Sequence, residues 1–404
     1  MNATSLVEGE LAKGRDISAV SLLDALVRSA HAAGASDIHI DPEREQLQVR
    51  LRIDGMLHDT YVIPERVHAE LLARLKVLAG LPTDEHQAAQ DGRFRFALAA
   101  DDWLDVRLSI APTYHGENVV LRLLAPLQDS FTLPRLGLDA QQLSVIQEAL
   151  ARSHGLILAT GPTGAGKTTM LYACIAALNT RERAIVTIED PIEYSLSGIN
   201  QIPANERAGL SFARGLRSIL RQDPDIIMVG EIRDDETARL AVNAALTGHL
   251  VLSTLHTNDA PTALPRLREM GVEPYLIAST VTLIVSQRLL RRVCNACARE
   301  RTLSPSERQR LSEILPRDKP LPHAFKQGAG CEACRGTGYA GRIGAYEVLP
   351  VTDALRELLA ASAPLRSIRA EAAKGGMRAL LANGYEKALL GLTSIEEVLR
   401  MPYE

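Results

Sequence analysis

The sequence has few aromatic residues: there is one tryptophan among 404 residues, and Phe, Trp and Tyr together make up 4%. It also has no excess of basic residues, since the formal net charge is −4. Proteins that bind nucleic acid usually carry a basic domain, and binders of single strands stack bases on aromatic side chains. The composition therefore argues against nucleic acid as a partner.

Long apolar runs are also missing. No uninterrupted run approaches the roughly 18 residues that a membrane-spanning helix requires. The first residues, MNATSLVEGELAKGRD, have neither the basic segment nor the apolar segment of a secretory signal peptide. We therefore expect a cytoplasmic protein without direct membrane insertion, whose contact with a membrane passes through a partner.

The length predicts two or three domains. Residues 18–127 combine helical spacing with alternating strands, which is typical of an α+β domain with a largely antiparallel sheet. From residue 139 onward, short apolar strands alternate with helices, as in a parallel sheet. The predicted divisions are a tail (1–17), the α+β domain (18–127), a linker (128–138), an α/β core (139–290), a cysteine-bearing element (291–345) and a mostly helical region (346–404).

One segment fits the phosphate-binding loop pattern GxxxxGK[ST] at every fixed position. An apolar strand, 155–160, precedes it, and a helical segment, 169–178, follows. Backbone N–H groups of such a loop converge on phosphate, aided by the positive end of the helix. The residues predicted to bind nucleotide here are Gly161, Pro162, Thr163, Gly164, Ala165, Gly166, Lys167, Thr168 and Thr169. Lys167 would reach the β- and γ-phosphates of ATP, and the Thr168 hydroxyl would ligate Mg²⁺.

Polar residues follow three further apolar strands of the core. Glu189 ends the first, Glu231 lies two residues after the second, and His256 follows the third. Ligands of an open parallel sheet bind at the carboxyl ends of its strands, so these groups should gather beside the phosphate loop. We predict Glu189 as the base that activates water and Glu231 as the carboxylate on the metal side, although the two roles could be exchanged. His256 could sense the γ-phosphate.

The second of these strands departs from the commonest Walker B pattern. Such a strand usually ends in Asp, whereas here Gly230 stands at that position and Glu231 follows. Asp223 and Asp225 precede the strand and should lie at its other end. The acid nearest the phosphate loop is therefore predicted to be a glutamate.

Four boxes resemble the secretion and type IV pilus ATPase family. TIEDPIEY (187–194) is similar to its Asp box, LRQDPDIIMVGEIRD (220–234) to its Walker B region, and TGHLVLSTLHTND (247–259) to its His box. ASDIHIDP (35–42) resembles the opening of its second N-terminal domain. The resemblance covers the chain from about residue 18 onward, and a glycine at the end of the Walker B strand is normal in this family.

The resemblance implies a fold and an activity. The fold is α/β, with a RecA-like P-loop ATPase core, a PAS-like α+β domain before it and a zinc-bearing, mostly helical C-terminal region. Members are homohexameric ATPases at the cytoplasmic side of the inner membrane, where they act on a platform protein. They drive type II secretion or pilus assembly, and some drive pilus retraction. We predict a type II secretion ATPase, with pilus assembly as the alternative.

The resemblance also implies further nucleotide contacts. Arginines of the second N-terminal domain reach bound nucleotide in this family, and the matching positions are Arg93, Arg107 and Arg122. Guanidinium groups neutralise charge on the transferred phosphoryl group. The alternative is that they form the solvated face of a sheet. Within the His box, His249 joins His256 as a predicted nucleotide contact.

Two CxxC pairs stand in the third region: Cys294 with Cys297, and Cys331 with Cys334. Four thiolates suit a closed, tetrahedral Zn²⁺ site, although the gap between the pairs is longer than in common zinc ribbons. The alternatives are redox dithiols or a disulfide, which a reducing cytoplasm disfavours. In the ATPase family that this sequence resembles, the pilus retraction branch lacks the four-cysteine element, so a role in pilus retraction is not expected.

The N-terminus raises a question about recruitment. Relatives in the resembling family begin with a further domain that docks on a membrane-associated partner, and residues 1–17 are too few to supply it. Two other classes stay open. A nucleic-acid translocase could share the ATPase core, and a nucleotide-binding scaffold could bind ATP without turnover.

Overall fold

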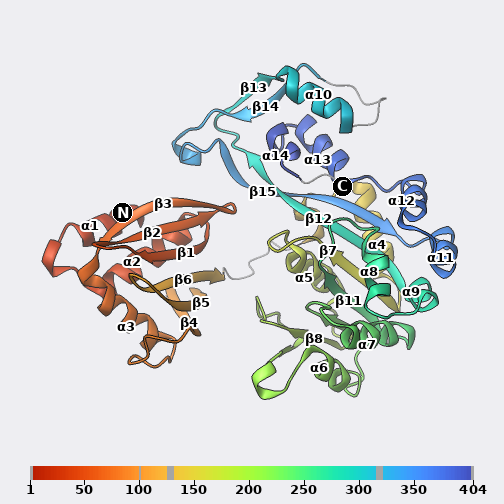
Figure 1. The fold of residues 1–404 in the computed structure, drawn as a ribbon, viewed down its shortest axis with the longest axis horizontal. Helices are drawn as coiled ribbons and strands as arrows, with labels where there is room; N and C mark the ends of the chain where they lie inside the picture. The colour runs from red at the N-terminus through yellow and green to blue at the C-terminus, as the bar shows by residue number, and fades with distance from the viewer. Residues whose placement is uncertain (1–2, 100–101, 125–131, 315–321, 402–404) are drawn as a thin grey trace. The chain divides into compact units, whose positions relative to one another are not determined.

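The computed structural model describes residues 3–99, 102–124, 132–314 and 322–401. The chain forms two compact units, Met1–Leu127 and Gln128–Glu404, each of which is described by itself (Figure 1). Among the described residues, no helix has both the length and the apolar character needed to cross a membrane.

Unit 1 is built on a six-stranded antiparallel sheet with the order β3-β2-β1-β6-β5-β4. Its strands are β1 (Ala35–Pro42), β2 (Gln46–Ile53), β3 (Met56–Pro64), β4 (Gln90–Ala99), β5 (Asp102–Thr113) and β6 (Gly116–Leu124). Its α-helices are α1 (Ala3–Leu11), α2 (Ala19–Ala32) and α3 (His68–Leu78), with short 3-10 helices at Gly14–Asp16 and Glu65–Val67. The predicted α+β class is confirmed.

Alternation of side chains explains how unit 1 forms a core. In β2, Leu47, Val49 and Leu51 are buried while the residues between them are partly exposed, as expected for a sheet with one covered face. Helix α2 starts at Ser18, whose hydroxyl accepts a hydrogen bond from Ser21 N at 3.4 Å. Its apolar side chains join those of the sheet in one buried cluster. The other face of the sheet is left for polar side chains.

Unit 2 contains a seven-stranded sheet with the order β15-β12-β7-β11-β10-β8-β9. Its strands are β7 (Gly155–Thr160), β8 (Ile185–Glu189), β9 (Asn200–Pro203), β10 (Ile226–Val229), β11 (Leu250–Leu255), β12 (Val281–Val293) and β15 (Tyr339–Pro350). All neighbours are parallel except β12 and β15. Every residue of β7, β8, β10 and β11 is buried, which is typical of a parallel sheet covered on both faces.

Helices cover this sheet and form the C-terminal region (Figure 1). They are α4 (Ala140–Leu150), α5 (Lys167–Leu178), α6 (Phe212–Ile219), α7 (Asp235–Leu246), α8 (Ala263–Glu269), α9 (Pro274–Thr280), α10 (Pro305–Ile314), α11 (Asp353–Ala360), α12 (Leu365–Lys374), α13 (Leu380–Leu389) and α14 (Ile395–Leu399). Short 3-10 helices lie at Leu133–Leu136, Glu206–Ala208 and Glu332–Cys334, and a hairpin is formed by β13 (Ala298–Thr302) and β14 (Ala324–Gly328).

The sheet extends beyond the predicted core boundary at Leu290. Strand β12 continues to Val293, and β15 returns beside it as the antiparallel edge strand, so the cysteine element is carried by two long strands of the core (Figure 1). Helix α13 covers part of that edge, since Asn383 Oδ1 accepts a hydrogen bond from Tyr346 N at 3.0 Å. The helical region therefore starts after Pro350 rather than at residue 346.

The predicted linker, 128–138, is only partly described. Residues 125–131 lie outside the described residues. The rest contacts unit 2: Leu133 is buried, and Tyr346 donates a hydrogen bond to Leu136 O at 2.9 Å. Gly137 packs against Ile343, because a Cβ there would lie 2.7 Å from Ile343 Cγ1. Residues 132–138 thus belong to unit 2 by their contacts.

Candidate nucleotide site and four-cysteine cluster

The phosphate loop joins β7 to α5 and is held tightly against β12. Gly161 and Gly166 have φ values of 141° and 88°, which favour glycine. A Cβ on Gly161 would lie 2.6 Å from the carbonyl oxygen of Gln287, and one on Gly166 would lie 2.8 Å from Gln287 Nε2. Gln287 also donates a hydrogen bond to Ala165 O at 2.5 Å. Glycine is therefore required at both ends of the loop by backbone conformation and by space.

The loop leaves the start of α5 open to an anion. No side chain of the described residues caps this helix, and its first turn contains no acid. Pro162, Thr163 and Gly164 are exposed, whereas Thr168 and Thr169 are partly exposed in the first turn. An uncapped helix N-terminus preceded by a glycine-rich loop is a ready-made phosphate site. The predicted loop residues therefore have the local geometry that phosphate binding requires.

Lys167 is folded back onto the loop that precedes it. Its ammonium donates hydrogen bonds to Gly161 O at 2.8 Å and Pro162 O at 3.1 Å, and the residue is only 9% exposed. Burial lowers the pKa of Lys167, an effect that nearby Glu231 opposes and Arg288 reinforces. These carbonyl oxygens are neutral partners, so negatively charged phosphate oxygens would compete well for the same ammonium.

At the end of β8, Glu189 is buried and fully engaged within unit 2. It is 2% exposed, and its carboxylate accepts hydrogen bonds from Tyr172, from Thr187 Oγ1 at 2.6 Å and from Gln201 Nε2 at 3.1 Å. The Tyr172 hydroxyl also accepts from Glu193 N at 3.2 Å. This network fixes the segment after β8, and Glu189 is its centre.

At the end of β10, Glu231 is more open. Its side chain is 16% exposed, pairs with Arg233 and lies 3.4 Å from His256 Nε2. The glycine before it is explained by space: a Cβ on Gly230 would lie 3.3 Å from Glu189 Cα and from Ile188 O. An aspartate at position 230 would therefore press on β8, which accounts for the departure from the commonest Walker B pattern.

The strand register brings most of the predicted groups to one edge. Val229 pairs with Ile188 and with Ser253, and Leu255 pairs with Thr160. Glu189, Glu231 and His256 therefore lie at the same carboxyl edge as the phosphate loop. Asp225 lies at the opposite edge, as predicted, where it accepts a hydrogen bond from Ala184 N at 2.7 Å.

His249 is not brought to the phosphate loop of its own chain. It precedes β11, and its carbonyl accepts a hydrogen bond from Gly155 N, at the start of β7, at 3.1 Å. Its Nδ1 lies 2.9 Å from Ala244 O. Because β7 and β11 are parallel, His249 sits at the amino edge of the sheet, opposite the phosphate loop. Within one chain, the predicted nucleotide contact of His249 does not form.

The sequence reasoning missed two residues that support this edge. Tyr172 lies in the helical segment predicted to follow the loop, and Gln287 belongs to none of the motifs in the sequence. A usable signal existed for Tyr172, because a buried tyrosine normally finds a hydrogen-bond partner. For Gln287, which is 2% exposed, the contact with Ala165 crosses 122 residues of sequence, and no local pattern predicts it.

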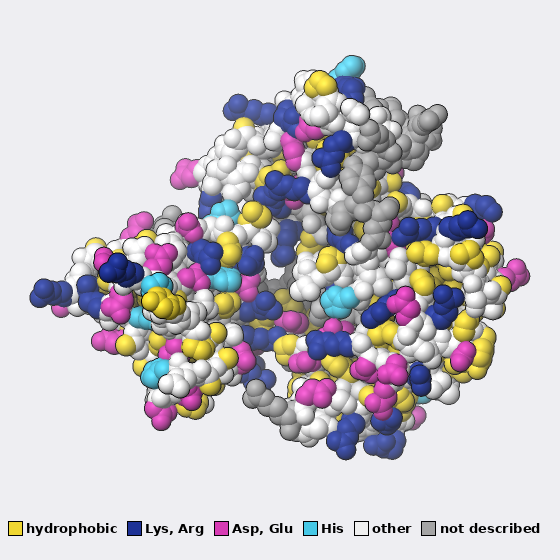
Figure 2. All heavy atoms as spheres, in the orientation of Figure 1, with side chains coloured by type: hydrophobic (Ala, Val, Ile, Leu, Met, Phe, Trp, Pro, Cys, Tyr) yellow, Lys and Arg dark blue, Asp and Glu magenta, His cyan; other side chains and the backbone are white. Residues whose placement is uncertain are grey.

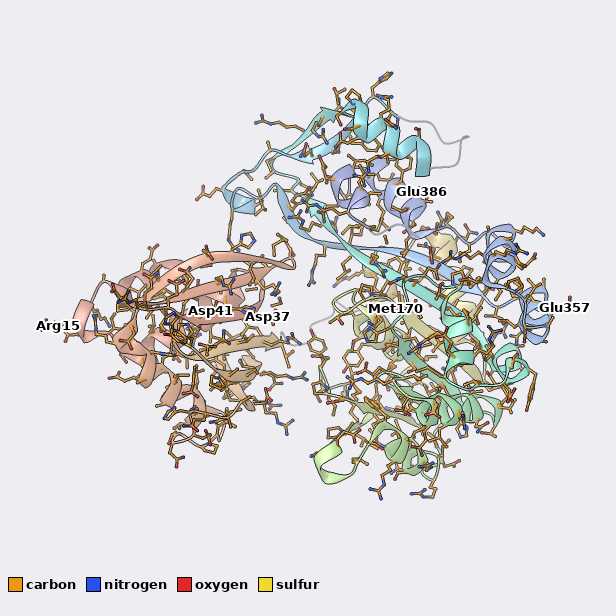
Figure 3. All side chains as sticks on the ribbon, viewed as in Figure 1. Arg15, Asp37, Asp41, Met170, Glu357 and Glu386 are labelled. Atoms are coloured by element: carbon orange, nitrogen blue, oxygen red, sulfur yellow. The ribbon has the colours of Figure 1, made fainter. Side chains whose placement is uncertain are left out.

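In unit 1, the three predicted arginines lie in one row across the sheet. Arg93 pairs with Arg107 in the strand register, and Arg107 pairs with Arg122. The row continues to Asp37 on β1, which is labelled in Figure 3 and lies 3.0 Å from Arg122 Nε. Arg93 is exposed and Arg107 partly exposed. Cross-strand neighbours share a face, so unit 1 presents a row of guanidinium groups that contains a single acid.

The four predicted cysteines converge at the far end of β12 and β15. Their Sγ atoms all lie within 4.8 Å of one another, with distances of 3.9 Å for Cys294–Cys331, 3.7 Å for Cys297–Cys334 and 3.6 Å for Cys331–Cys334. None of them is in a disulfide. A tetrahedron with metal–sulfur bonds of about 2.3 Å has sulfur–sulfur edges of about 3.8 Å. The arrangement fits a four-thiolate metal site.

Backbone groups favour the thiolate form of Cys334. Cys331 N and Gly338 N donate to Cys334 Sγ at 3.1 and 3.2 Å. Burial acts to raise the pKa of the Cys334 thiol, but these donors and the neighbouring thiols outweigh it and lower the pKa to about 6. Thiolates are the metal-binding form of cysteine. The fifth cysteine, Cys174, is buried in α5, and burial raises its pKa to about 12, as for a core residue.

Comparisons with known proteins agree with this architecture. Residues 13–400 match the family model for "Type II/IV secretion system protein". The type IV pilus assembly ATPase PilB of Myxococcus xanthus is 43% identical over 96% of the chain and 69% of its own length. The type II secretion system protein E of Xanthomonas campestris is 45% identical over 95% of the chain and 67% of its own length. PilB of Thermus thermophilus is 44% identical over 94% of the chain but only 42% of its own length.

Solved structures give the same fold. The Legionella pneumophila ATPase DotB superposes with a TM-score of 0.68 over 93% of this chain and 94% of its own, at 22% identity. The pilus retraction motor PilT with bound ADP gives 0.66 over 95% and 97%, at 26% identity. The predicted fold is confirmed: an α+β unit is followed along the chain by a P-loop ATPase core. The extent of the family match and the identity to its relatives show that this chain belongs to the type II/IV secretion system protein family.

Proposed function

We propose that this chain is the ATP-hydrolysing motor subunit of a type II secretion machine. Its relatives carry the names of secretion and pilus assembly ATPases, and ATP hydrolysis is its enzymatic activity. The observation that carries the proposal is the phosphate loop. Lys167 donates a hydrogen bond to a carbonyl oxygen of this loop, and helix α5, which follows it, has no side-chain cap. Pilus assembly is the alternative, because relatives with that name are about as similar as those named for secretion.

ATP would bind with its phosphates at residues 161–169. Lys167 would exchange Gly161 O and Pro162 O for β- and γ-phosphate oxygens, and the Thr168 hydroxyl would ligate Mg²⁺. The metal neutralises charge on the phosphates. Glu231 lies on the same side of the site, and its negative charge acts to raise the pKa of Lys167.

We assign the two carboxylates differently from the sequence prediction. Glu231 is the base that orients and deprotonates the attacking water, because its side chain is partly exposed, pairs with Arg233 and lies close to His256. Glu189 holds the segment after β8 through hydrogen bonds to buried neighbours. His256 lies close enough to Glu231 to respond to the γ-phosphate.

The arginine row supports an assembly in which unit 1 completes a nucleotide site. Arg93 and Arg107, with Arg122 held partly by Asp37, would neutralise charge on the transferred phosphoryl group. In a homohexamer, closure of the units on ATP would drive a platform protein of the inner membrane, with the motor on the cytoplasmic side.

Zinc is the metal that fits the cysteine cluster. Four thiolates with edges near 3.7 Å leave no open position, so the ion would be structural and not catalytic. It would hold the hairpin β13–β14 against the ends of β12 and β15.

Phosphate release by the purified chain tests the activity. Wild type should hydrolyse ATP, and Lys167→Ala should reduce turnover by at least about 100-fold, because several kcal/mol of phosphate stabilisation are lost. A wild-type chain that binds ATP without turnover would make it a scaffold instead. Binding to DNA that weakens steeply with salt would favour a translocase, although acidic side chains lie among the basic ones in Figure 2.

Deletion of the gene separates the two machines. Loss of secreted enzymes with normal surface pili supports type II secretion, whereas loss of pili with normal secretion supports pilus assembly. Neighbouring genes for pseudopilins and a secretin, or for pilins, would point the same way.

A further inference from the structure

The loop that carries His256 is anchored by the C-terminal part of unit 2. We call residues 256–260, which follow β11, the His256 loop. His256 itself is half exposed and touches Glu231. Its neighbours further along the loop are different, because Asn258, Asp259 and Ala260 each contact a group from β12, β15 or α12. The position of His256 therefore depends on residues more than 25 positions away in sequence.

Glu347 on β15 provides the most buried of these contacts. Its carboxylate accepts hydrogen bonds from Ala260 N at 2.9 Å and from Leu380 N, at the start of α13, at 3.0 Å. The residue is 5% exposed. Burial raises its pKa, which the two N–H donors oppose. One carboxylate thus joins the His256 loop to the first residue of α13.

Three further contacts hold the same loop. Arg369 on α12 pairs with Asp259 Oδ2 at 2.6 Å. On β12, Arg288 donates to Asn258 O at 3.0 Å, and Ser286 donates to the same oxygen at 3.4 Å. Ser286 and Glu347 are direct partners in the β12–β15 register. Three consecutive loop residues are therefore fixed by one strand pair and one helix.

From this geometry we infer that Glu347 is a positioning residue for ATP hydrolysis. Its contacts are with Ala260 N and Leu380 N, so it acts through the His256 loop. It fixes the loop that sets the distance between His256 and Glu231, and it makes that distance sensitive to α12 and α13. The inference rests on the proposed function, since it concerns the turnover of the same site.

The substitution Glu347→Gln tests this with little change of shape. An amide has one acceptor oxygen, so one of the two backbone N–H groups, from Ala260 or Leu380, loses its partner. The matched control is Glu397→Gln. Glu397 is also a buried acid that accepts from a backbone N–H, that of Arg291 at 3.0 Å. Among the described residues, the side-chain partners of Glu397 are Arg291 and Arg400, which lie outside the His256 loop.

We expect Glu347→Gln to lower kcat about tenfold, the cost of one misplaced hydrogen bond to a charged group, with KM for ATP changed less than about twofold. Glu397→Gln should lower thermal stability by about as much as Glu347→Gln does, but it should leave kcat near the wild-type value. Equal kcat values for Glu347→Gln and wild type, or equal losses in the two variants, would overturn the inference.

A double-mutant cycle separates positioning from general weakening. If Glu347 acts through the loop, Glu347→Gln should have no further effect on kcat in a His256→Ala background. Independent, multiplying effects would overturn the inference. Arg369→Gln, a change at a side chain that is 39% exposed, repeats the cycle if Glu347→Gln does not fold. Absence of turnover in wild type would instead count against the proposed function.

Discussion

The two sites of unit 2 are constructed in opposite ways. At the phosphate loop, the charged groups have neutral or exchangeable partners: Lys167 contacts loop carbonyls, and Glu231 has a partly exposed side chain beside His256. In the cysteine cluster, the Sγ atoms of Cys331 and Cys334 lie 3.9 and 3.7 Å from those of Cys294 and Cys297, respectively. One site can change its contacts, and the other is closed.

This difference separates activity from stability. A site that exchanges partners contributes little to folding, so its residues can be replaced with a large loss of turnover and a small loss of stability. A closed metal site contributes its binding free energy to folding. Substitutions there should have the opposite pattern. The geometry thus assigns each residue either a role mainly in turnover or a role mainly in stability, and substitutions can test that assignment.

The largest effect on turnover among these variants is expected for Glu231→Gln. The amide keeps the shape but cannot take a proton from water, so kcat should fall about 100-fold or more. ATP binding should persist, because Lys167 and the loop are unchanged. Phosphate release and the binding of a fluorescent ATP analogue measure the two properties. If Glu231→Gln turns over normally and Glu189→Gln does not, Glu189 is the base, as the sequence predicts, and the role proposed for Glu231 is wrong.

The phosphate loop and each CxxC pair were predictable because each is set by residues close in sequence. Gly161 to Lys167 form one turn, and each CxxC pair forms one bend. The contrast between Glu189 and Glu231 was not predictable in this way. It depends on Tyr172, which lies 17 residues from Glu189, and on the register of β8 with β10, which places Gly230 against Glu189.

Substitution of the arginines should have the effect expected at the phosphate-loop site: a large loss of turnover and a small loss of stability. Arg93 and Arg107 lie on the polar face of a sheet whose core is on the other side, so Arg93→Ala and Arg107→Ala should change stability by less than about 1 kcal/mol. Each should lower kcat by about 10-fold or more if it neutralises transition-state charge. Arg95→Ala is the control, because Arg95 pairs with Asp105 on the same strands. Normal turnover in both variants would limit the row to a structural role.

The arginine row also shows where sequence reasoning stops. Alternation predicted strands within residues 18–127, but alternation leaves the register between strands undetermined. Only the paired register aligns Arg93, Arg107 and Arg122 and adds Asp37 from a strand near the start of the chain. The acid restrains Arg122, which distinguishes it from the other two.

The closed site should behave in the reverse manner. Purified protein should contain about one zinc per chain, and Cys331→Ser should lose it, because three thiolates bind far more weakly than four. Thermal unfolding should shift down by several degrees, with ATP binding within about twofold of wild type. Elemental analysis and calorimetry measure these. Cys174→Ser, at the lone core cysteine, should keep the zinc. Zinc-free wild-type protein prepared without chelator would contradict the assignment.

The smallest effect on turnover is expected for Tyr172→Phe, because Tyr172 is a buried residue that supports Glu189 beside the phosphate loop. Removal of the hydroxyl leaves Glu189 without one donor and should cost about 1–3 kcal/mol of folding free energy, with only a few-fold loss of kcat.

The pH dependence of that cost identifies its source. Burial, together with Glu189, raises the pKa of Tyr172 above its usual value near 10. The folded state therefore favours the neutral phenol, so the contribution of Tyr172 to stability is complete below about pH 10 and decreases as the pH rises further. Urea unfolding at pH 8 and pH 10.5 should show the difference between wild type and Tyr172→Phe becoming smaller at the higher pH. A difference that stays constant or grows would mean that the hydroxyl does not act as the donor to Glu189.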